Sequence, residues 1–524
     1  MGDFDTMRSQ IYNLDNGEYE EIAFIRLRYS TIINYMSQSF KLITSLMFAI
    51  IVTKRLSVEE YGLWGTVFGV TGALSMVYTL WGWWVPRFYA RSRRNIVSTC
   101  FGLNLLYAPI GLLCTIVFGI YYDNLIGWGL EFFILGSLFV IVDAFLKYLM
   151  SIVTSSRPYI RGYVNFIRES ARVSLAYVLV AILMLRLYGV LITIIISSII
   201  SVISLFTFLK KSYVQIPAPN LSLEHIKRIF KNMYIPLLST LSSMLNNLER
   251  PIVTALTVST ESTAYLTVSY IPRNIIIGSL YAFTGGLMAK LLRKPDKEDI
   301  EDVLRLAFII NIGLAGILIS MSTPVLSVFR IEYVNAKPLF ILYLLSSMLF
   351  VPLSIFMTIS MSLEKRDLYE EGLALIKTTL FKTQFINFIR VLMALGIGII
   401  GLLYAAHYGI IDPVQRVMFF PIGWNISSLF ALVIMYRMSK KMIRFNIPWR
   451  EAFSAVIGVI ITSAVIHLLG YDKIIVHSIW RDLPSLIPAM IIAIVLYSLI
   501  VLCLSKWARE FVYTALKIYL TKNR

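Results

Sequence analysis

The chain has 524 residues, of which 58% are hydrophobic and only 15% are charged, and its formal net charge is +18. Soluble domains carry about 25% charged residues, so this composition excludes a soluble globular enzyme and indicates a protein that crosses a membrane many times. In such a protein a basic excess is expected from cytoplasmic loops rather than from nucleic-acid binding. The three cysteines and four histidines are scattered, which predicts no disulfide framework, no metal site and no resident cofactor.

Fourteen apolar runs are long enough to cross a bilayer, which takes about 20 helical residues each. They lie at residues 29–53, 62–85, 96–121, 125–153, 173–187 with an N-terminal extension, 190–209, 233–256, 264–291, 306–329, 339–362, 383–405, 418–438, 452–469 and 486–504. The fold class predicted from them is an all-α polytopic membrane protein with fourteen transmembrane helices.

The longest linker between apolar runs, residues 210–232, contains two prolines and divides twelve of the runs into two sets of six. We therefore expect a tail at 1–28, an N-lobe at 29–209, the linker at 210–232, a C-lobe at 233–438, two further spans within 439–505 and a tail at 506–524. Part of the linker, residues 223–231, is expected to form an amphipathic helix on the membrane surface.

Lysine and arginine are concentrated on one side of the predicted membrane, for example at residues 91–94, 210–211, 440–441 and 506–524. The positive-inside rule assigns that side to the cytoplasm, and an even number of spans then places both termini there. The first 28 residues are polar and lack the apolar centre of a signal peptide. The expected location is the plasma membrane.

The first and seventh runs each carry a polar stripe. Each stripe has successive steps of four, three and four residues, which place its members on one helical face. The stripes comprise Asn34, Gln38, Lys41 and Ser45 in the first run, and Ser239, Ser243, Asn246 and Arg250 in the seventh. A charge that faces lipid costs several kcal/mol, so both stripes should face protein or water. The matched stripes also indicate a duplication of the two lobes.

Other ionisable residues lie inside the predicted spans. Arg273 is nine residues, or ~14 Å of helical rise, into the eighth run and is too deep to reach the surface easily. Asp143 and Lys147 have the i, i+4 spacing of an intrahelical ion pair. Glu249 precedes Arg250, but adjacent helical side chains do not face each other, so it is not expected to neutralise that arginine.

The remaining arginines of interest lie near the ends of predicted runs. Arg87 follows a cluster of tryptophans and fits either a cavity cation or an interfacial anchor. Arg172 and Arg390 are expected to extend toward the membrane surface, as long basic side chains near span ends usually do.

Two segments carry a resemblance to a known family. The turn Leu56-Ser-Val-Glu-Glu-Tyr-Gly-Leu-Trp64 resembles the link between the first two spans of the multidrug/oligosaccharidyl-lipid/polysaccharide exporter superfamily, in particular its polysaccharide or oligosaccharide-lipid flippases. The run 226–236 and the segment Leu248-Glu-Arg-Pro251 are similar to the start of the second lobe, although Pro251 and Ala264 depart from the usual pattern.

This resemblance implies two six-helix lobes around a central cavity, lined mainly by spans one, two, seven and eight, with two extra C-terminal helices. It implies a flippase, not an enzyme, that works by alternating access. The expected substrate is an oligosaccharide linked through a phosphate or pyrophosphate to a polyprenyl or dolichyl lipid, and the protein is expected to act as a monomer among membrane lipids. The predicted contacts to its phosphate or acidic sugars are Lys41, Arg250 and Arg273, and Arg87 is a further candidate for substrate binding. Those to its sugar hydroxyls are Asn34, Gln38 and Asn246.

Two alternatives stay open at this stage. A cation-coupled multidrug exporter of the same superfamily would favour acidic cavity residues and usually twelve spans. A membrane glycosyltransferase, polymerase or ligase would place catalytic residues in sizeable outer loops, which are short here. The energy source, whether a sodium or proton gradient or the membrane potential, is also open, and the acids to consider for ion pairing or coupling are Asp143, Glu169 and Glu249.

Overall fold

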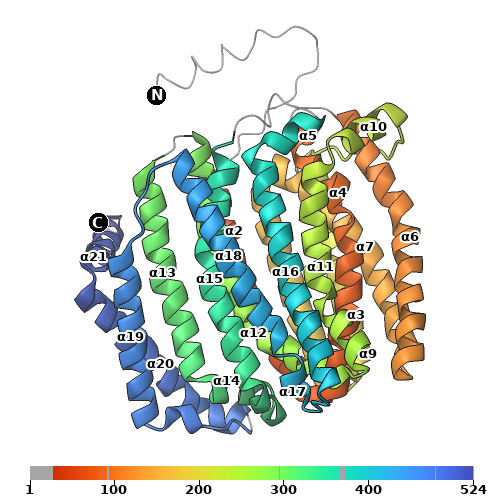
Figure 1. Cartoon of the computed structure of the whole chain (residues 1–524). Helices are drawn as coiled ribbons and strands as arrows, with labels where there is room; N and C mark the ends of the chain where they lie inside the picture. The colour runs from red at the N-terminus through yellow and green to blue at the C-terminus, as the bar shows by residue number, and fades with distance from the viewer. Residues whose placement is uncertain (1–26, 91–93, 294–295, 365–371, 478, 523–524) are drawn as a thin grey trace, which may run out of the picture.

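The computed structural model describes residues 27–90, 94–293, 296–364, 372–477 and 479–522, and every regular element in these ranges is a helix (Figure 1). The helices of the first half are α2 (Leu27–Arg55), α3 (Val58–Met76), α4 (Thr79–Gly82), α5 (Val85–Ala90), α6 (Arg94–Ile126), α7 (Leu130–Ser156), α8 (Pro158–Ala176), η1 (Tyr177–Ile182) and α9 (Arg186–Lys211).

The second half begins with α10 (Leu223–Lys231) and ends with α21 (Lys506–Lys522). Between them lie α11 (Tyr234–Thr257), α12 (Thr260–Arg293), α13 (Lys297–Ser320), α14 (Ser322–Phe329), η2 (Ile331–Ala336), α15 (Lys337–Ser362), η4 (Gly372–Lys377), α16 (Thr379–His407), α17 (Pro413–Arg416), α18 (Phe419–Met442), α19 (Trp449–Leu468), η5 (Tyr471–Lys473) and α20 (Ile479–Leu504).

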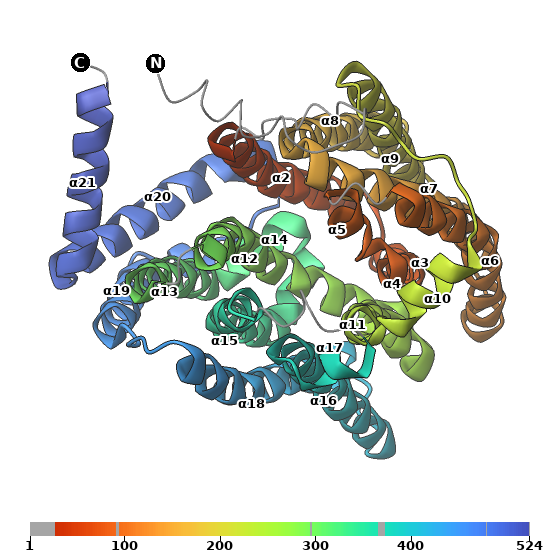
Figure 2. The ribbon, with the colours of Figure 1, turned by 90° about the horizontal axis from the view of Figure 1, so that it is seen from above.

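The long helices form two groups, which are called the N-lobe (α2 to α9) and the C-lobe (α11 to α18) below. In the N-lobe α2 packs along α8, and α7 contacts α6 and α9; in the C-lobe α18 packs against α15 and α16. Viewed from above, the two groups lie on opposite sides of the bundle, and α19 and α20 are attached beside α13 (Figure 2). The end of the bundle with α10 is called the α10 end and the opposite end, with α14 and α17, the α14 end (Figure 1).

Ten helical segments of the described residues are long and apolar enough to cross a membrane by length and composition. The long helices α3, α8, α11 and α12 are not among these ten. Two glutamates and several glycines reduce the hydropathy of α3, and charged or hydroxyl side chains do so in α8 and α11. Such residues are tolerated at membrane depth where a helix faces other protein or a water-filled space, and these helices lie beside the cavity described below.

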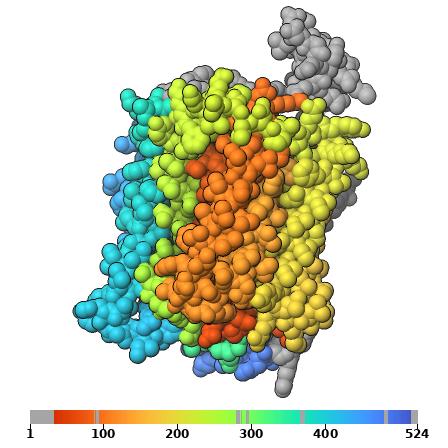
Figure 3. Space-filling view, turned by 90° about the vertical axis from the view of Figure 1, so that its right-hand side faces the viewer, coloured from red at the N-terminus to blue at the C-terminus, as the bar shows by residue number. Residues whose placement is uncertain are grey.

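The lipid-facing character of the outer helices is clear on α6, which runs down the face shown in Figure 3. Its large aliphatic side chains with half or more of their surface exposed are Leu106, Ile110, Leu113 and Val117. Their steps of four, three and four residues form one stripe that points away from the bundle. Together with the candidate spans, this stripe confirms the prediction of an all-α polytopic membrane protein.

Some predicted boundaries were wrong. The fifth run was expected at 173–187 with an N-terminal extension; α8 does begin earlier, at Pro158, but the π-helical η1 ends at Ile182, before the expected end. The N–H groups in the first turn of a helix have no intrahelical acceptor. Proline has no N–H, so Pro158 suits the first position of α8 and favours a helix start there. The ninth run was expected to be one helix at 306–329, but α13 ends at Ser320 and α14 is a separate short helix.

The segment expected to be a turn between the first two spans is largely the start of α3. Ser57 is its N-cap, and the Ser57 hydroxyl accepts a hydrogen bond from the Glu60 N–H at 3.1 Å. The Glu60 carboxylate in return accepts from the Ser57 N–H at 2.9 Å. This reciprocal capping box satisfies two donors that a helix start would otherwise leave without partners.

The two lobes are in close contact at the α14 end. There α3 carries Gly62, Gly65, Gly69 and Gly72, which are called the α3 glycine ridge below. A Cβ atom added to Gly62 would lie 1.8 Å from the carbonyl oxygen of Thr260, and one added to Gly69 would lie 2.5 Å from Cδ of Pro251. The absence of side chains is therefore what lets α3 reach the backbones of α11 and α12.

Hydroxyl groups add hydrogen bonds to this contact. The Thr254 hydroxyl of α11 lies 2.6 Å from that of Thr66 on α3 and 2.7 Å from that of Thr263 on α12. Arg330 of the C-lobe also donates to the carbonyl of Leu56 at 2.6 Å. The α14 end of the bundle is thus closed by direct contacts between lobes.

Candidate binding cavity

A cavity of about 970 Å³ lies between the lobes and is lined by side chains of both. Among its described lining residues, six are cationic and one is acidic: Lys41, Lys147, Arg168, Arg172, Arg273 and Arg390, against Asp143. Six side-chain amides also line it: Gln38, Asn246, Asn247, Asn274, Gln384 and Asn387. The wall is therefore strongly basic and rich in groups that can hydrogen-bond to sugar hydroxyls.

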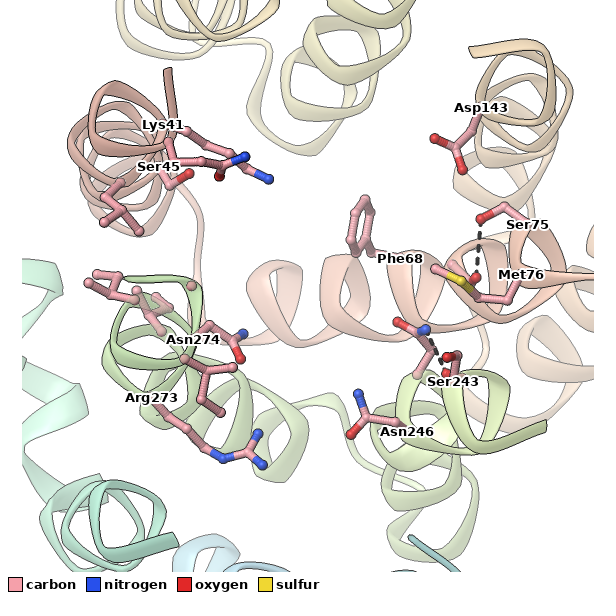
Figure 4. A pocket seen from close by; sticks show the side chains of 18 of the residues that line it. Lys41, Ser45, Phe68, Ser75, Met76, Asp143, Ser243, Asn246, Arg273 and Asn274 are labelled. Atoms are coloured by element: carbon pink, nitrogen blue, oxygen red, sulfur yellow. Dashed lines mark hydrogen bonds between the residues drawn. The ribbon is translucent and has the colours of Figure 1, made fainter. Parts of the chain in front are cut away.

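On the N-lobe side, Lys41 and Ser45 of α2 point toward the open space, across from Asn274 and Arg273 of α12 (Figure 4). Gln38 lines the cavity beside them. Three members of the predicted α2 stripe thus face the cavity. The fourth, Asn34, does not line it, because its amide donates to the carbonyl of Pro158 at 3.2 Å and joins α2 to α8.

Asp143 and Lys147 form the ion pair that their spacing predicted, with Oδ2 and Nζ 2.7 Å apart. The Lys147 ammonium also donates to the carbonyl and the hydroxyl of Ser75, at 3.1 and 3.0 Å. This pair therefore joins α7 to α3 within the N-lobe. Its charges largely cancel, so the net charge of the described cavity wall comes from the other five cations.

Glu249 is 1% exposed and lies in a cage of aromatic donors in the C-lobe. Its carboxylate accepts hydrogen bonds from the Tyr343 hydroxyl at 2.7 Å, the Trp424 indole N–H at 2.9 Å and the Tyr270 hydroxyl at 3.3 Å. The carboxylate thus ties α11 to α12, α15 and α18. Buried carboxylates need such donors, because they lose their hydration.

Arg273 packs on the same aromatic residues, with its guanidinium carbon 4.5 Å from the Tyr270 ring centre and 5.1 Å from that of Trp424. Its Nε donates to the Ser346 hydroxyl at 3.0 Å. Cation–π contacts and this hydrogen bond hold the arginine at the cavity wall although it is only 5% exposed. The prediction that Arg273 lies too deep to reach the membrane surface agrees with this burial.

The seventh-span stripe is only partly in the cavity. Ser243 and Asn246 line it, whereas Arg250 is not among the lining residues. The guanidinium carbon of Arg250 lies 5.8 Å from the Tyr270 ring centre, and a Cβ at Gly65 would be 3.7 Å from its Cδ. The α3 helix therefore covers this arginine in the present conformation. Its predicted role with substrate stays a prediction, as does that of Arg87, whose side chain lies outside the described part of the structure.

Three of the cations that line the cavity were not predicted to do so from the sequence. Arg390 was expected to extend to the membrane surface, but it is 6% exposed, lies over the rings of Phe350 and Trp424, and donates to Asn387 Oδ1 at 3.0 and 3.2 Å. Arg168 and Arg172 also line the cavity. The spacing of Arg161, Arg168 and Arg172, with steps of seven and four, is a helical-face signal that could have revealed the last two.

Glu169 lies between these two arginines and is 1% exposed. Its carboxylate oxygens are 2.5 Å from Arg172 Nη2 and 3.6 Å from Arg168 Nη2, and one of them accepts from the Thr44 hydroxyl at 3.2 Å. Glu169 therefore joins α8 to α2. An ion-coupling role for it, as for Asp143 and Glu249, remains a prediction.

Comparison of the sequence with protein-family models finds no match, and comparison with curated proteins finds none. Comparison of the fold with solved structures does find matches. A structure described as lipid II flippase MurJ in an inward closed conformation superposes with a TM-score of 0.64 at 15% identity, over 92% of this chain and 99% of MurJ. An inward-facing multidrug resistance MATE family transporter of the MOP superfamily gives 0.58 at 13% identity, over 79% of this chain and 98% of that chain.

An outward-facing MATE transporter superposes with a TM-score of 0.55 at 13% identity, over 79% of this chain and 95% of that chain. The chain has the fold of these transporters. The resemblance to the multidrug/oligosaccharidyl-lipid/polysaccharide exporter (MOP) superfamily is thereby confirmed at the level of the fold. In this fold, the basic side chains described above line a cavity between the two lobes.

Proposed function

We propose that this protein is a flippase that moves a lipid-linked oligosaccharide across the plasma membrane. The observation that carries the proposal is the charge of the cavity wall, where six cations face one acid among the described lining residues. A carrier-lipid phosphate is anionic, and cations in a site of low dielectric attract it more strongly than they would in water. The cavity amides suit sugar hydroxyls, which could not cross hydrocarbon without hydrogen-bond partners.

In this mechanism the sugar and phosphate enter the cavity while the polyprenyl or dolichyl chain stays in lipid. Arg273 and Lys41 contact the anionic part of the substrate from opposite lobes, and Gln38 and Asn246 bind sugar hydroxyls. Arg250 joins the contacts when α3 moves away from it. Relative movement of the two lobes then exposes the cavity to the other side of the membrane, as repeats of this kind permit.

The chain length also favours a lipid flippase over a multidrug exporter. The two MATE structures match over almost their whole length yet leave about a fifth of this chain unmatched, whereas MurJ leaves 8%. The exporter remains the second candidate, since it shares the fold. It would favour acidic cavity residues for cationic drugs, and Asp143, the acid in the described lining, is already paired with Lys147.

The glycosyltransferase, polymerase and ligase alternative is disfavoured by the fold, since the structural neighbours reported above are transporters. We further propose that the protein acts as a monomer without a cofactor, with both termini in the cytoplasm. Transport would draw on a sodium or proton gradient or on the membrane potential.

The test is a strain that lacks the protein. It should accumulate a lipid-linked glycan on the cytoplasmic leaflet and lose surface glycan, and the wild-type gene should restore both. Arg273→Ala and Arg250→Ala should fail to restore surface glycan although the protein reaches the membrane, whereas lysine at either position should restore it in part, because it keeps the charge but loses the planar fork. Lys382→Ala, an exposed cation on α16, is the control and should behave as wild type.

Unchanged surface glycan with increased drug sensitivity in the deletion strain would replace the flippase by the exporter. Full restoration by both alanine variants would show that the two arginines do not bind the substrate.

A further inference from the structure

A second cationic surface lies on the N-lobe wall, apart from Arg273 and Arg390. Arg168 and Arg172 of α8 face α2, which packs along α8, and Lys41 of α2 lines the same part of the cavity. Glu169 is the one acidic residue in the sequences of α2 and α8. Three cations at this wall therefore share a single carboxylate.

The contacts show how that carboxylate is used. Glu169 is bound to Arg172 at 2.5 Å and is 3.6 Å from Arg168, and Arg172 also donates to the Ser45 hydroxyl at 2.9 Å. Within the described residues no hydrogen bond or salt bridge involves the Lys41 ammonium, which points into the cavity (Figure 4). Cations grouped in a poorly hydrated site repel one another unless an anion lies between them.

The C-lobe cations are arranged differently. Arg273 and Arg390 both lie over the ring of Trp424, and they belong to α12 and α16. Lys41 of the N-lobe and Arg273 of the C-lobe lie across the cavity from each other (Figure 4). The described part of the cavity wall thus has two groups of cations, one on each lobe.

We infer that Lys41, Arg168 and Arg172 form a second anion site, which takes a further anionic group of the transported glycolipid while Arg273 and Arg390 hold its first phosphate. This inference rests on the proposed flippase function and deepens it, because it requires a substrate with two anionic centres. The second centre is either a carboxylate on an acidic sugar or the second phosphate of a pyrophosphate link.

Lys41→Gln is the variant of choice for the test, because it removes a charge without breaking an ion pair of the described structure. Arg172→Gln alone would leave Glu169 buried without its nearest cation, so the second variant is the Glu169→Gln/Arg172→Gln pair, which removes both charges together. Arg55→Gln is the matched control, since Arg55 is an exposed cation near the end of the same α2 helix. Melting temperatures confirm that each variant is folded.

The measurement is calorimetric binding of two soluble probes, trigalacturonate and inorganic pyrophosphate, to the full-length protein in lipid nanodiscs. If the second centre is an acidic sugar, Lys41→Gln and the double variant weaken trigalacturonate binding about tenfold, the loss of roughly one charge-assisted contact. Pyrophosphate binding then changes less than twofold in these variants and depends on Arg273→Gln.

If the second centre is a phosphate, pyrophosphate binding is weakened by Lys41→Gln and by Arg273→Gln alike, and trigalacturonate binding by neither. Either pattern supports two anion sites. Equal binding of both probes by wild type and Lys41→Gln would overturn the second site and leave the flippase proposal standing if Arg273→Gln still weakens pyrophosphate binding. Failure of the wild-type protein to bind either probe would overturn both proposals.

Discussion

The α3 glycine ridge provides a direct way to disturb the contact between the lobes. In Gly62→Ala, the new methyl carbon would lie 1.8 Å from the carbonyl oxygen of Thr260, against the 3.4 Å at which ordinary contacts begin. The clash is with backbone of the opposite lobe, so no side-chain rotation can relieve it. The same change favours α3 itself, because alanine is a better helix former than glycine by about 1 kcal/mol.

The clash must therefore be relieved by separating α3 from α12. Overpacking of a well-packed interior costs about 1–3 kcal/mol. If that cost falls on the conformation that is closed at the α14 end, the equilibrium shifts about 5- to 150-fold toward conformations open at that end. The melting temperature should change little, since the helices of each lobe keep their own contacts.

The assay follows a single cysteine, Asn246→Cys at the cavity wall, in a protein whose three native cysteines are replaced by serine. A membrane-impermeant maleimide is added to intact cells, from the predicted outer side, which is the α14 end. Labelling reports the fraction of molecules open to that side, so Gly62→Ala should raise its initial rate at least fivefold.

Gly396→Ala is the matched control. Gly396 is also a helical glycine, but a Cβ there would meet nothing within 4 Å, so labelling should stay at the wild-type rate. Equal labelling in wild type and Gly62→Ala, with both proteins folded, would refute the reasoning that this ridge holds the α14 end closed.

Three further predictions concern stability and topology. Glu249→Ala should lower the melting temperature strongly, since each buried donor left without an acceptor costs about 1–3 kcal/mol. Glu249→Gln keeps an acceptor and should lower the melting temperature less. Equal decreases in the two variants would show that the hydrogen bonds to Tyr343 and Trp424 are unimportant. A double-mutant cycle on Asp143→Ala and Lys147→Ala should give a coupling of about 0.5–3 kcal/mol, and strictly additive melting losses would contradict the ion pair. Single cysteines in the linker between Lys210 and Lys231 should be protected from impermeant reagents in intact cells, and labelling from outside would reverse the predicted topology.

What could be predicted from the sequence depended on local spacing. The α2 stripe was visible because three of its members are separated by steps that any helix turns into one face, and lipid is too costly a neighbour for Lys41. The pairing of Asp143 with Lys147 has the same origin, since a helix brings residues four apart together whatever its surroundings. Hydropathy likewise predicted most of the membrane helices, but not the charged start of α8 or the break between α13 and α14.

The tertiary structure decided which lobe surfaces meet and which cations share the cavity. Arg390 and Arg250 both lie inside membrane helices, yet helix rotation and neighbours bury one at the cavity wall and place the other under α3. The arginines of α8 become a binding wall only because α8 packs along α2, a contact between residues more than a hundred positions apart. No local spacing encodes such a contact, because it depends on how whole helices pack, and the pairing of the α3 glycine ridge with Thr260 and Pro251 has the same cause.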